Sequence, residues 1–247
     1  MGDQLIMSSS AIHFVEGRAM PSTTKTLTLD VYERLRHDIR GGNLTPAMPL
    51  RVDWLRKKYE VGATPLREAL SRLAAEYLVT TEGKRGFSVA PVSLVEFREL
   101  TSLRDYIDRH ALEMAILQGD DEWESAIVAR FHLLSKAPRV GQSNDPEAVA
   151  ERSRRHNDFH IALIAGCESK WLMRIWLQMT DLQERYRLIA TRDVPTPDDV
   201  AQEIDDEHRA IMELVLARKA KEAIEMLSHH QRRTIASVEA WAKAKGL

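Results

Sequence analysis

The chain has 247 residues, 44% of them apolar and 29% charged, which is typical of a globular protein with one large or two modest domains. It holds one cysteine, Cys167, and its N-terminus lacks a basic block followed by an apolar one, so we expect a reducing cytoplasm and no internal disulfide. No stretch approaches the roughly 18 apolar residues that a membrane helix needs. Sparse glycine and proline favour long helices over a turn-rich β fold.

Charge is divided unevenly along the chain. Residues 25–92 carry 12 lysines and arginines against 8 aspartates and glutamates, a net of +4, whereas residues 93–247 carry 22 against 27, a net of −5. This asymmetry is typical of a small nucleic-acid-binding unit followed by an acidic sensing or assembling unit, although it also arises by chance.

The first 92 residues predict three helices. Residues 1–24 show no periodicity, and we expect them to fray. Apolar residues recur four apart over residues 28–40, which predicts an amphipathic helix, and a second short helix is predicted over residues 52–59. The third helix has the sharpest start signal, with Thr64 as its N-cap and Pro65 at its first position.

A hairpin with a basic tip follows the third helix, formed by two β-prone runs, residues 78–81 and 86–89. Helix, helix, turn, helix and hairpin is the order of a winged helix-turn-helix. Such a third helix enters a major groove N-terminus first, where Arg67 can bind the O6 and N7 atoms of guanine. The residues expected to contact double-stranded DNA are Thr64, Arg67, Ser71, Arg72, Lys84, Arg85 and Gly86. The alternatives are a solvated arginine face and a winged helix that binds protein.

Beyond Pro91 the pattern is helical throughout. A capping box at residues 93–96 begins a new helix, and no strand pattern or fixed-period repeat follows. Six helical segments are predicted, at about 93–117, 121–136, 146–166, 169–190, 198–217 and 220–244. We therefore predict a mainly α protein: a flexible segment (1–24), a winged helix-turn-helix (25–92) and an all-α six-helix bundle (93–247).

Four histidines of the predicted bundle form a candidate metal site. His156 and His160 lie one turn apart on one helix, and an antiparallel bundle can bring His208 and His230 to the same interior point. Imidazole nitrogens suit Zn, Ni, Mn or Fe. Alternatively, any of them packs in the core or lies on the surface, as we expect for His110, His132 and His229.

Arg104 is a candidate ligand-binding residue because it lies among apolar positions of the first bundle helix. If its side chain faces the interior, its guanidinium matches the carboxylate of a ligand that a metal also coordinates. An ordinary salt bridge to a neighbouring helix explains this arginine equally well.

Several segments carry a resemblance to a known family: residues 31–39, Thr64-Pro65-Leu66-Arg67-Glu68-Ala69-Leu70, Arg85-Gly86-Phe87, Leu103-Arg104, Phe159-His160, Glu207-His208 and His230. Together they resemble GntR-type bacterial transcription regulators of the FadR branch, which carry an FCD sensor domain. The resemblance covers about residues 27–245, and six rather than seven bundle helices resemble the VanR subgroup.

The resemblance implies a homodimeric regulator, expected to be a repressor, that binds a palindromic operator and responds to a small carboxylate effector. It also implies that His156, His160, His208 and His230 bind a divalent metal ion (Zn, Ni or Mn), with Arg104 binding the effector. At the two positions directly before Thr64, the family has Ser-Arg and this chain has Gly62-Ala63. An arginine that contacts bases in the family is therefore absent here. The family's first metal ligand is commonly Asp or Asn, where this chain has His156.

Two other functions stay open from the sequence. One is a metal-dependent, hydrolase-like enzyme that uses the histidines to activate water. The other is a regulator whose metal is purely structural, in which case removing the metal unfolds the second domain.

Overall fold

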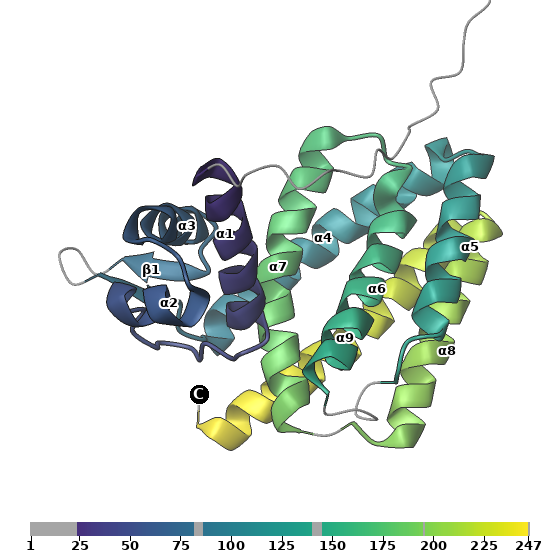
Figure 1. Ribbon diagram of the computed structural model, residues 1–247. Helices are drawn as coiled ribbons and strands as arrows, with labels where there is room; N and C mark the ends of the chain where they lie inside the picture. Colours follow the sequence, from purple (N-terminus) through teal and green to yellow (C-terminus); the bar gives the residue numbers. More distant parts are fainter. Residues whose placement is uncertain (1–23, 82–85, 140–144, 195, 247) are drawn as a thin grey trace, which may run out of the picture.

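The structure is a computed structural model that describes residues 24–81, 86–139, 145–194 and 196–246. Within these ranges the chain forms nine helices and one two-stranded sheet, with a small N-terminal unit beside a larger helical bundle (Figure 1). The prediction of a mainly α chain with an N-terminal winged helix-turn-helix is confirmed. No described helix is long and apolar enough to cross a membrane.

The N-terminal unit contains α1 (Thr24–Arg40), α2 (Val52–Tyr59), α3 (Ala63–Ala75), β1 (Val79–Thr81) and β2 (Phe87–Val89). The two strands pair antiparallel, with Val79 opposite Val89. Val31, Leu35 and Ile39, which share the apolar face of α1, are all fully buried. They pack on the buried face of α3, so removal of this apolar surface from water fixes the two helices against each other.

The start of α3 corrects one expectation. Thr64 is not the N-cap: the helix begins at Ala63, and Gly62 is the N-cap, with no side chain to accept a hydrogen bond. A proline does not fix where a helix begins. The backbone N–H groups of the first turn have no partner within the helix, so proline is tolerated at any position of that turn, and Pro65 is the third residue of α3. Thr64 therefore lies inside the first turn, where its side chain is exposed.

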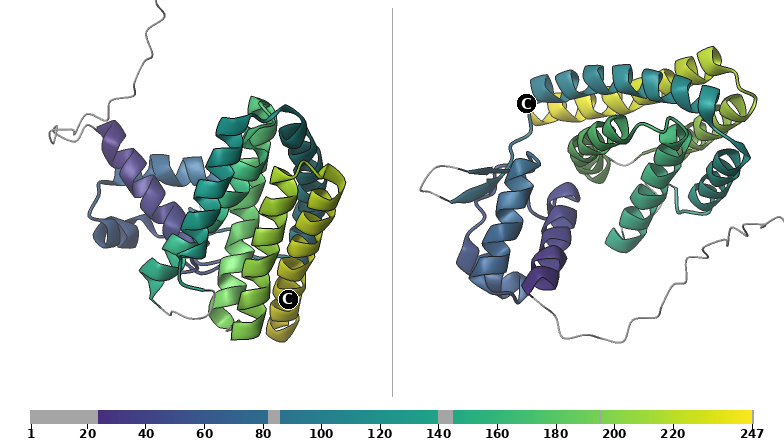
Figure 2. Two further views of the ribbon diagram at one scale, coloured as in Figure 1. Left: turned by 90° about the vertical axis from the view of Figure 1, so that its right-hand side faces the viewer. Right: turned by 90° about the horizontal axis from the view of Figure 1, so that it is seen from above.

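The bundle contains α4 (Leu94–Gln118), α5 (Asp121–Ser135), α6 (Pro146–Ala165), α7 (Lys170–Asp193), α8 (Asp198–Leu216) and α9 (Ala220–Lys245). The start signal predicted at residues 93–96 is confirmed: Ser93 caps α4 by accepting from the N–H of Glu96. Asp145 caps α6 in the same way, by accepting from the N–H of Glu147. The long helices α4 and α9 lie side by side along the bundle (Figure 2). Their inner faces pack with α5, α6 and α8 around a shared apolar core.

Helix α7 joins the two units. Leu182 belongs to the apolar core of the N-terminal unit although it lies on a bundle helix. Next to it, Asp181 forms ion pairs with Arg36 and Arg40 of α1, the latter at 3.3 Å. Arg185, 1% exposed, donates to the carbonyl oxygens of residues 90 and 91 at 2.9 and 3.1 Å. One stripe of α7 thus holds the N-terminal unit against the bundle (Figure 1).

Candidate DNA-binding surface and metal centre

Helix α3 presents a polar face outward. Its apolar residues, among them Leu66 and Leu70, are fully buried, whereas Thr64, Arg67 and Ser71 are exposed. Arg67 makes no hydrogen bond or ion pair with any residue in the described part of the chain. Its guanidinium is therefore available to an outside partner.

Arg72 lies on a different side of α3 from Arg67, and its side chain is engaged by neighbouring residues. Its Nε donates to Glu76 at 3.3 Å, and its guanidinium lies 3.8 Å from the centre of the Tyr32 ring. Tyr32 in turn donates to Glu76 at 2.7 Å. These residues line a groove of about 1000 Å³ between the N-terminal unit and α7. Contact of Arg72 with DNA stays a prediction; only its Nε is engaged, and its side chain is 54% exposed.

The hairpin tip is only partly described. Lys84 and Arg85 lie outside the described residues. Gly86 is exposed and has a φ of 109°, a backbone conformation that favours glycine. Substitution of Gly86 would therefore strain the turn that leads into β2.

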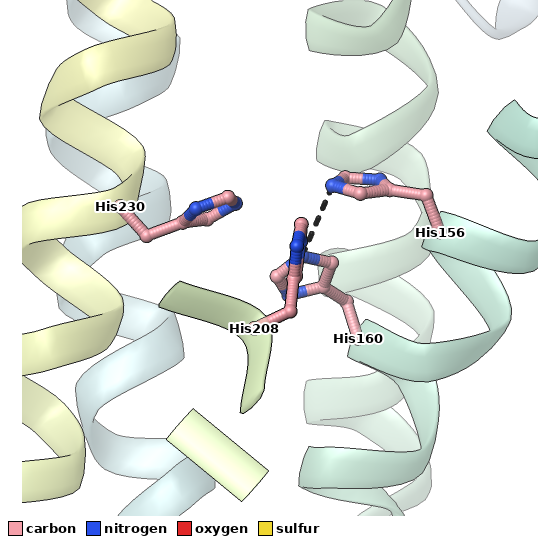
Figure 3. A group of neighbouring side chains, drawn as sticks. All are labelled: His156, His160, His208 and His230. Carbon is pink, nitrogen blue, oxygen red and sulfur yellow. Dashed lines mark hydrogen bonds between the residues drawn. The ribbon is translucent and has the colours of Figure 1, made fainter. Parts of the chain in front are cut away.

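The structure brings the four histidines of the sequence-based prediction together (Figure 3). His156 and His160 come from α6, His208 from α8 and His230 from α9. One ring nitrogen from each lies within 4.8 Å of the others, and the Nε2 atoms of His156 and His160 are 3.2 Å apart. Three helices thus place four potential ligand atoms around one point.

Burial keeps three of these imidazoles neutral. It is the main cause that lowers the pKa of His156, His160 and His208 well below the ordinary value, and repulsion from neighbouring histidines and arginines adds to it. A neutral imidazole is the form that binds a metal, so these three rings are already deprotonated for that purpose.

Hydrogen bonding orients the His230 ring, whereas the His208 ring lacks such support. His230 donates from Nδ1 to Glu207 at 2.9 Å, which leaves its Nε2 as a lone-pair donor, and Arg233 holds Glu207 from the other side at 2.9 Å. Both ring nitrogens of His208 are buried, and neither meets full hydrogen-bond geometry with a described residue, although the backbone of Ile204 is close enough to raise the pKa of the ring. At least one of these nitrogens therefore lacks a partner among the described residues, and a metal ion would supply one.

Ligand binding by Arg104 stays a prediction, and the salt bridge of this arginine is to Asp108 of the same helix, α4, and not to a neighbouring helix. Its side chain is 15% exposed, and its charge adds to the effect of burial in lowering the pKa of His160. It is also engaged already: it donates to Asp108 at 3.1 Å and to Gln183 of α7 at 2.8 Å, and lies over the Trp176 ring at 4.7 Å.

Sequence reasoning missed Arg187 and Glu184 on α7. Arg187 pairs with Glu184 and donates to Ser153 at 3.3 Å, which is one turn before His156 on α6. Burial raises the pKa of Glu184, but the charge and hydrogen bonds of Arg187 outweigh it and lower that pKa to about 2. In the sequence, Glu and Arg three apart are typical of a solvated helix surface, so no signal there distinguishes this buried pair.

An exposed helix-turn-helix face joined to an all-helical bundle with an internal polar cluster defines the class of DNA-binding transcriptional regulators. Residues 27–89 match the family described as bacterial regulatory proteins, gntR family, and residues 99–233 match the FCD domain. The chain therefore belongs to the GntR family and carries an FCD domain.

Similar proteins agree with this assignment. The chain is 36% identical over 203 residues to the HTH-type transcriptional repressor GlaR of Escherichia coli K12, covering 82% of this chain and 91% of GlaR. It is 34% identical to the regulator BphR of Paraburkholderia xenovorans LB400, covering 96% and 92%. The solved structure of E. coli McbR/YncC shares the fold, with a TM-score of 0.72 at 19% identity over 87% of this chain and 97% of McbR.

These families and relatives are transcriptional regulators, so the protein is a DNA-binding transcriptional regulator and not an enzyme. The alternative of a metal-dependent hydrolase is not supported.

Proposed function

We propose that the protein is a cytoplasmic, homodimeric repressor that binds a palindromic operator and whose operator affinity changes when a small carboxylate binds in the bundle. The observation that carries the DNA-binding part is the exposed, unpaired guanidinium of Arg67 on a helix whose opposite face is buried in the core. A rigid helix with one free arginine can contact base edges without rearranging.

The carboxylate site in this proposal is the histidine cluster. His156, His160, His208 and His230 would hold a divalent ion through neutral nitrogens, and the ion would supply an electrophilic point for a carboxylate oxygen. Arg104 can bind the other oxygen by exchanging its bond to Gln183 or Asp108 for one to the effector.

Helix α7 connects this site to the DNA-binding unit. Gln183 contacts Arg104 on one stripe of α7, while Asp181 and Leu182 contact the N-terminal unit on another. An effector that draws Arg104 away from Gln183 alters the packing of α7, and with it the placement of the two DNA-binding units of a dimer. The effector would thus shift the population of dimers toward the arrangement of DNA-binding units that binds the effector better.

Binding of the full-length protein to duplexes selected from a random library tests this function. Arg67→Ala is expected to weaken binding to the selected duplex by about 1–3 kcal/mol, mostly by relaxing the preference at one base pair. Arg232→Ala, an exposed arginine of α9, is the matched control and is expected to leave affinity unchanged. Wild-type affinity should fall steeply with salt. Absence of salt-sensitive binding, or equal specificity in Arg67→Ala, would refute the proposal.

A further inference from the structure

The groove between the DNA-binding unit and the first half of α7 lies apart from the histidine cluster. Its volume of about 1000 Å³ is at the upper end of the range for small-molecule sites. Helix α1 packs on both α3 and α7, and these two helices supply opposite walls (Figure 1). The lining residues of α7 recur three and four apart and so form one face of that helix: Lys170, Met173, Arg174, Leu177, Gln178 and Asp181. Neither the four clustered histidines nor Arg104 line the groove.

We propose that this groove binds an organic monoanion with an apolar body, and that the bound anion bridges the DNA-binding unit and the bundle. The apolar part of the lining suits such a body, and it consists of Ala75, Leu78, Ala165, Met173 and Leu177. Leu177 is 42% exposed and belongs to none of the apolar cores of the described chain. A ligand that covers Leu177 removes its apolar surface from water, which favours binding.

The charged part of the lining leaves one positive charge without a partner. It holds three cations and three carboxylates: Arg72, Lys170, Arg174, Glu76, Glu168 and Asp181. Asp181 is neutralised from outside the groove, because it pairs with Arg36 and Arg40, neither of which is in the lining. Neither Lys170 nor Arg174 forms an ion pair in the described part of the chain. Two carboxylates are left against three cations, so a ligand with one negative charge is complementary to the groove.

Two of these cations are held in place on opposite walls. The guanidinium of Arg72 on α3 lies 3.8 Å from the centre of the Tyr32 ring, and that of Arg174 on α7 lies 4.8 Å from the Trp171 ring. Stacking on a ring orders a guanidinium before it binds, which reduces the entropy that binding costs. Among the described residues Arg72 donates a hydrogen bond through Nε alone, and Arg174 donates none. Terminal N–H groups on both walls are therefore available to one anion.

An anion held from both walls links the two units at a second place. On α7 the N-terminal unit is already held by Asp181, Leu182 and Arg185. Because the anion needs both walls within reach, it binds the present placement of the DNA-binding unit and stabilises that placement. The groove thus adds a regulatory site to the one proposed inside the bundle.

Fluorescence titration of the full-length protein with 8-anilinonaphthalene-1-sulfonate, an aromatic monoanion, tests the proposal. We expect saturable binding of one dye per chain. N-phenyl-1-naphthylamine has the same rings without the charge and should bind about 10-fold more weakly. Arg72→Met and Arg174→Met keep an unbranched apolar side chain over each ring, and each should weaken binding of the anionic dye by about 5- to 10-fold, since the groove is open to water. Arg209→Met, the matched control, removes an exposed arginine that lies over Phe131 outside the groove and should leave the affinity unchanged.

A second pair of variants tests the apolar part of the lining. Leu177→Gln should weaken binding of both dyes, whereas Leu103→Gln, at an exposed position of α4, should not. Equal affinity for the two dyes, or no binding of the anionic dye, would overturn the proposal. An effect of only one of the two arginine variants would show that one wall holds the anion and would overturn the bridge. Circular dichroism checks the fold of each variant, and Arg72→Gln replaces Arg72→Met if that variant does not fold.

Discussion

The contact between α1 and α7 gives a prediction about how the DNA-binding unit is held. Asp181 is the shared partner of Arg36 and Arg40, and these three side chains are 24%, 25% and 19% exposed. The Nε atoms of both arginines are buried without a hydrogen-bond partner in the described structure; Arg36 also pairs with Glu33 of its own helix at 3.6 Å, whereas Asp181 is the acidic partner that reaches both arginines from α7. Asp181→Asn keeps the size of the side chain and removes its charge.

The free energy that Asp181→Asn is expected to cost lies between the values for exposed and for fully buried ion pairs. Exposed ion pairs contribute about 0–1 kcal/mol, whereas removing one partner of a fully buried pair costs about 3–5 kcal/mol. With roughly a quarter of each side chain exposed, we expect Asp181→Asn to cost about 1–2 kcal/mol, or about 5- to 30-fold in the equilibrium for opening the N-terminal unit. Leu182 and Arg185 remain in place, so the variant loosens this unit without releasing it.

Native-state hydrogen exchange measures this directly. Amides of α1 and α3 should exchange about 5- to 30-fold faster in Asp181→Asn, while those of α5 and α8, far from the contact, keep their protection. Glu239→Gln is the matched control because it removes the charge from the exposed Arg98–Glu239 ion pair of the bundle. Unchanged protection of α1 in Asp181→Asn, or equal loosening in Glu239→Gln, would show that the Asp181 cluster does not hold the unit.

Two further predictions concern the bundle. Because the pKa of Glu184 falls from 4.5 in the ordinary state to about 2 in the folded protein, its stabilisation is complete above about pH 4.5 and is lost as the pH falls towards 2. Urea unfolding should show a loss of at most about 3 kcal/mol over that interval, and Glu184→Gln should flatten it; an identical pH slope in the variant would assign the effect to other groups. Removing metal with a chelator should lower the melting temperature yet leave the far-ultraviolet circular dichroism of the helices nearly unchanged. Loss of most of the helical signal would instead support a purely structural metal.

The local elements follow from the sequence because they depend on neighbouring residues. The spacing of Val31, Leu35 and Ile39 predicts which face of α1 is buried, and all three are fully buried. Ser93 caps the helix that it was expected to cap, since a cap needs only a side-chain oxygen next to free N–H groups. The two-residue error at Thr64, whose predicted N-cap position belongs to Gly62, arose where proline is compatible with more than one position.

Only the tertiary structure decides which faces meet. Periodicity shows that a helix has a buried side but not what lies against it, because partner choice depends on packing between residues far apart in the chain. From the sequence, Leu182 is indistinguishable from other apolar residues of the bundle. Only the structure shows that it completes the apolar core of the DNA-binding unit. Likewise, Glu184 and Arg187 have the sequence pattern of a surface pair, and burial against Ser153 makes them part of the site.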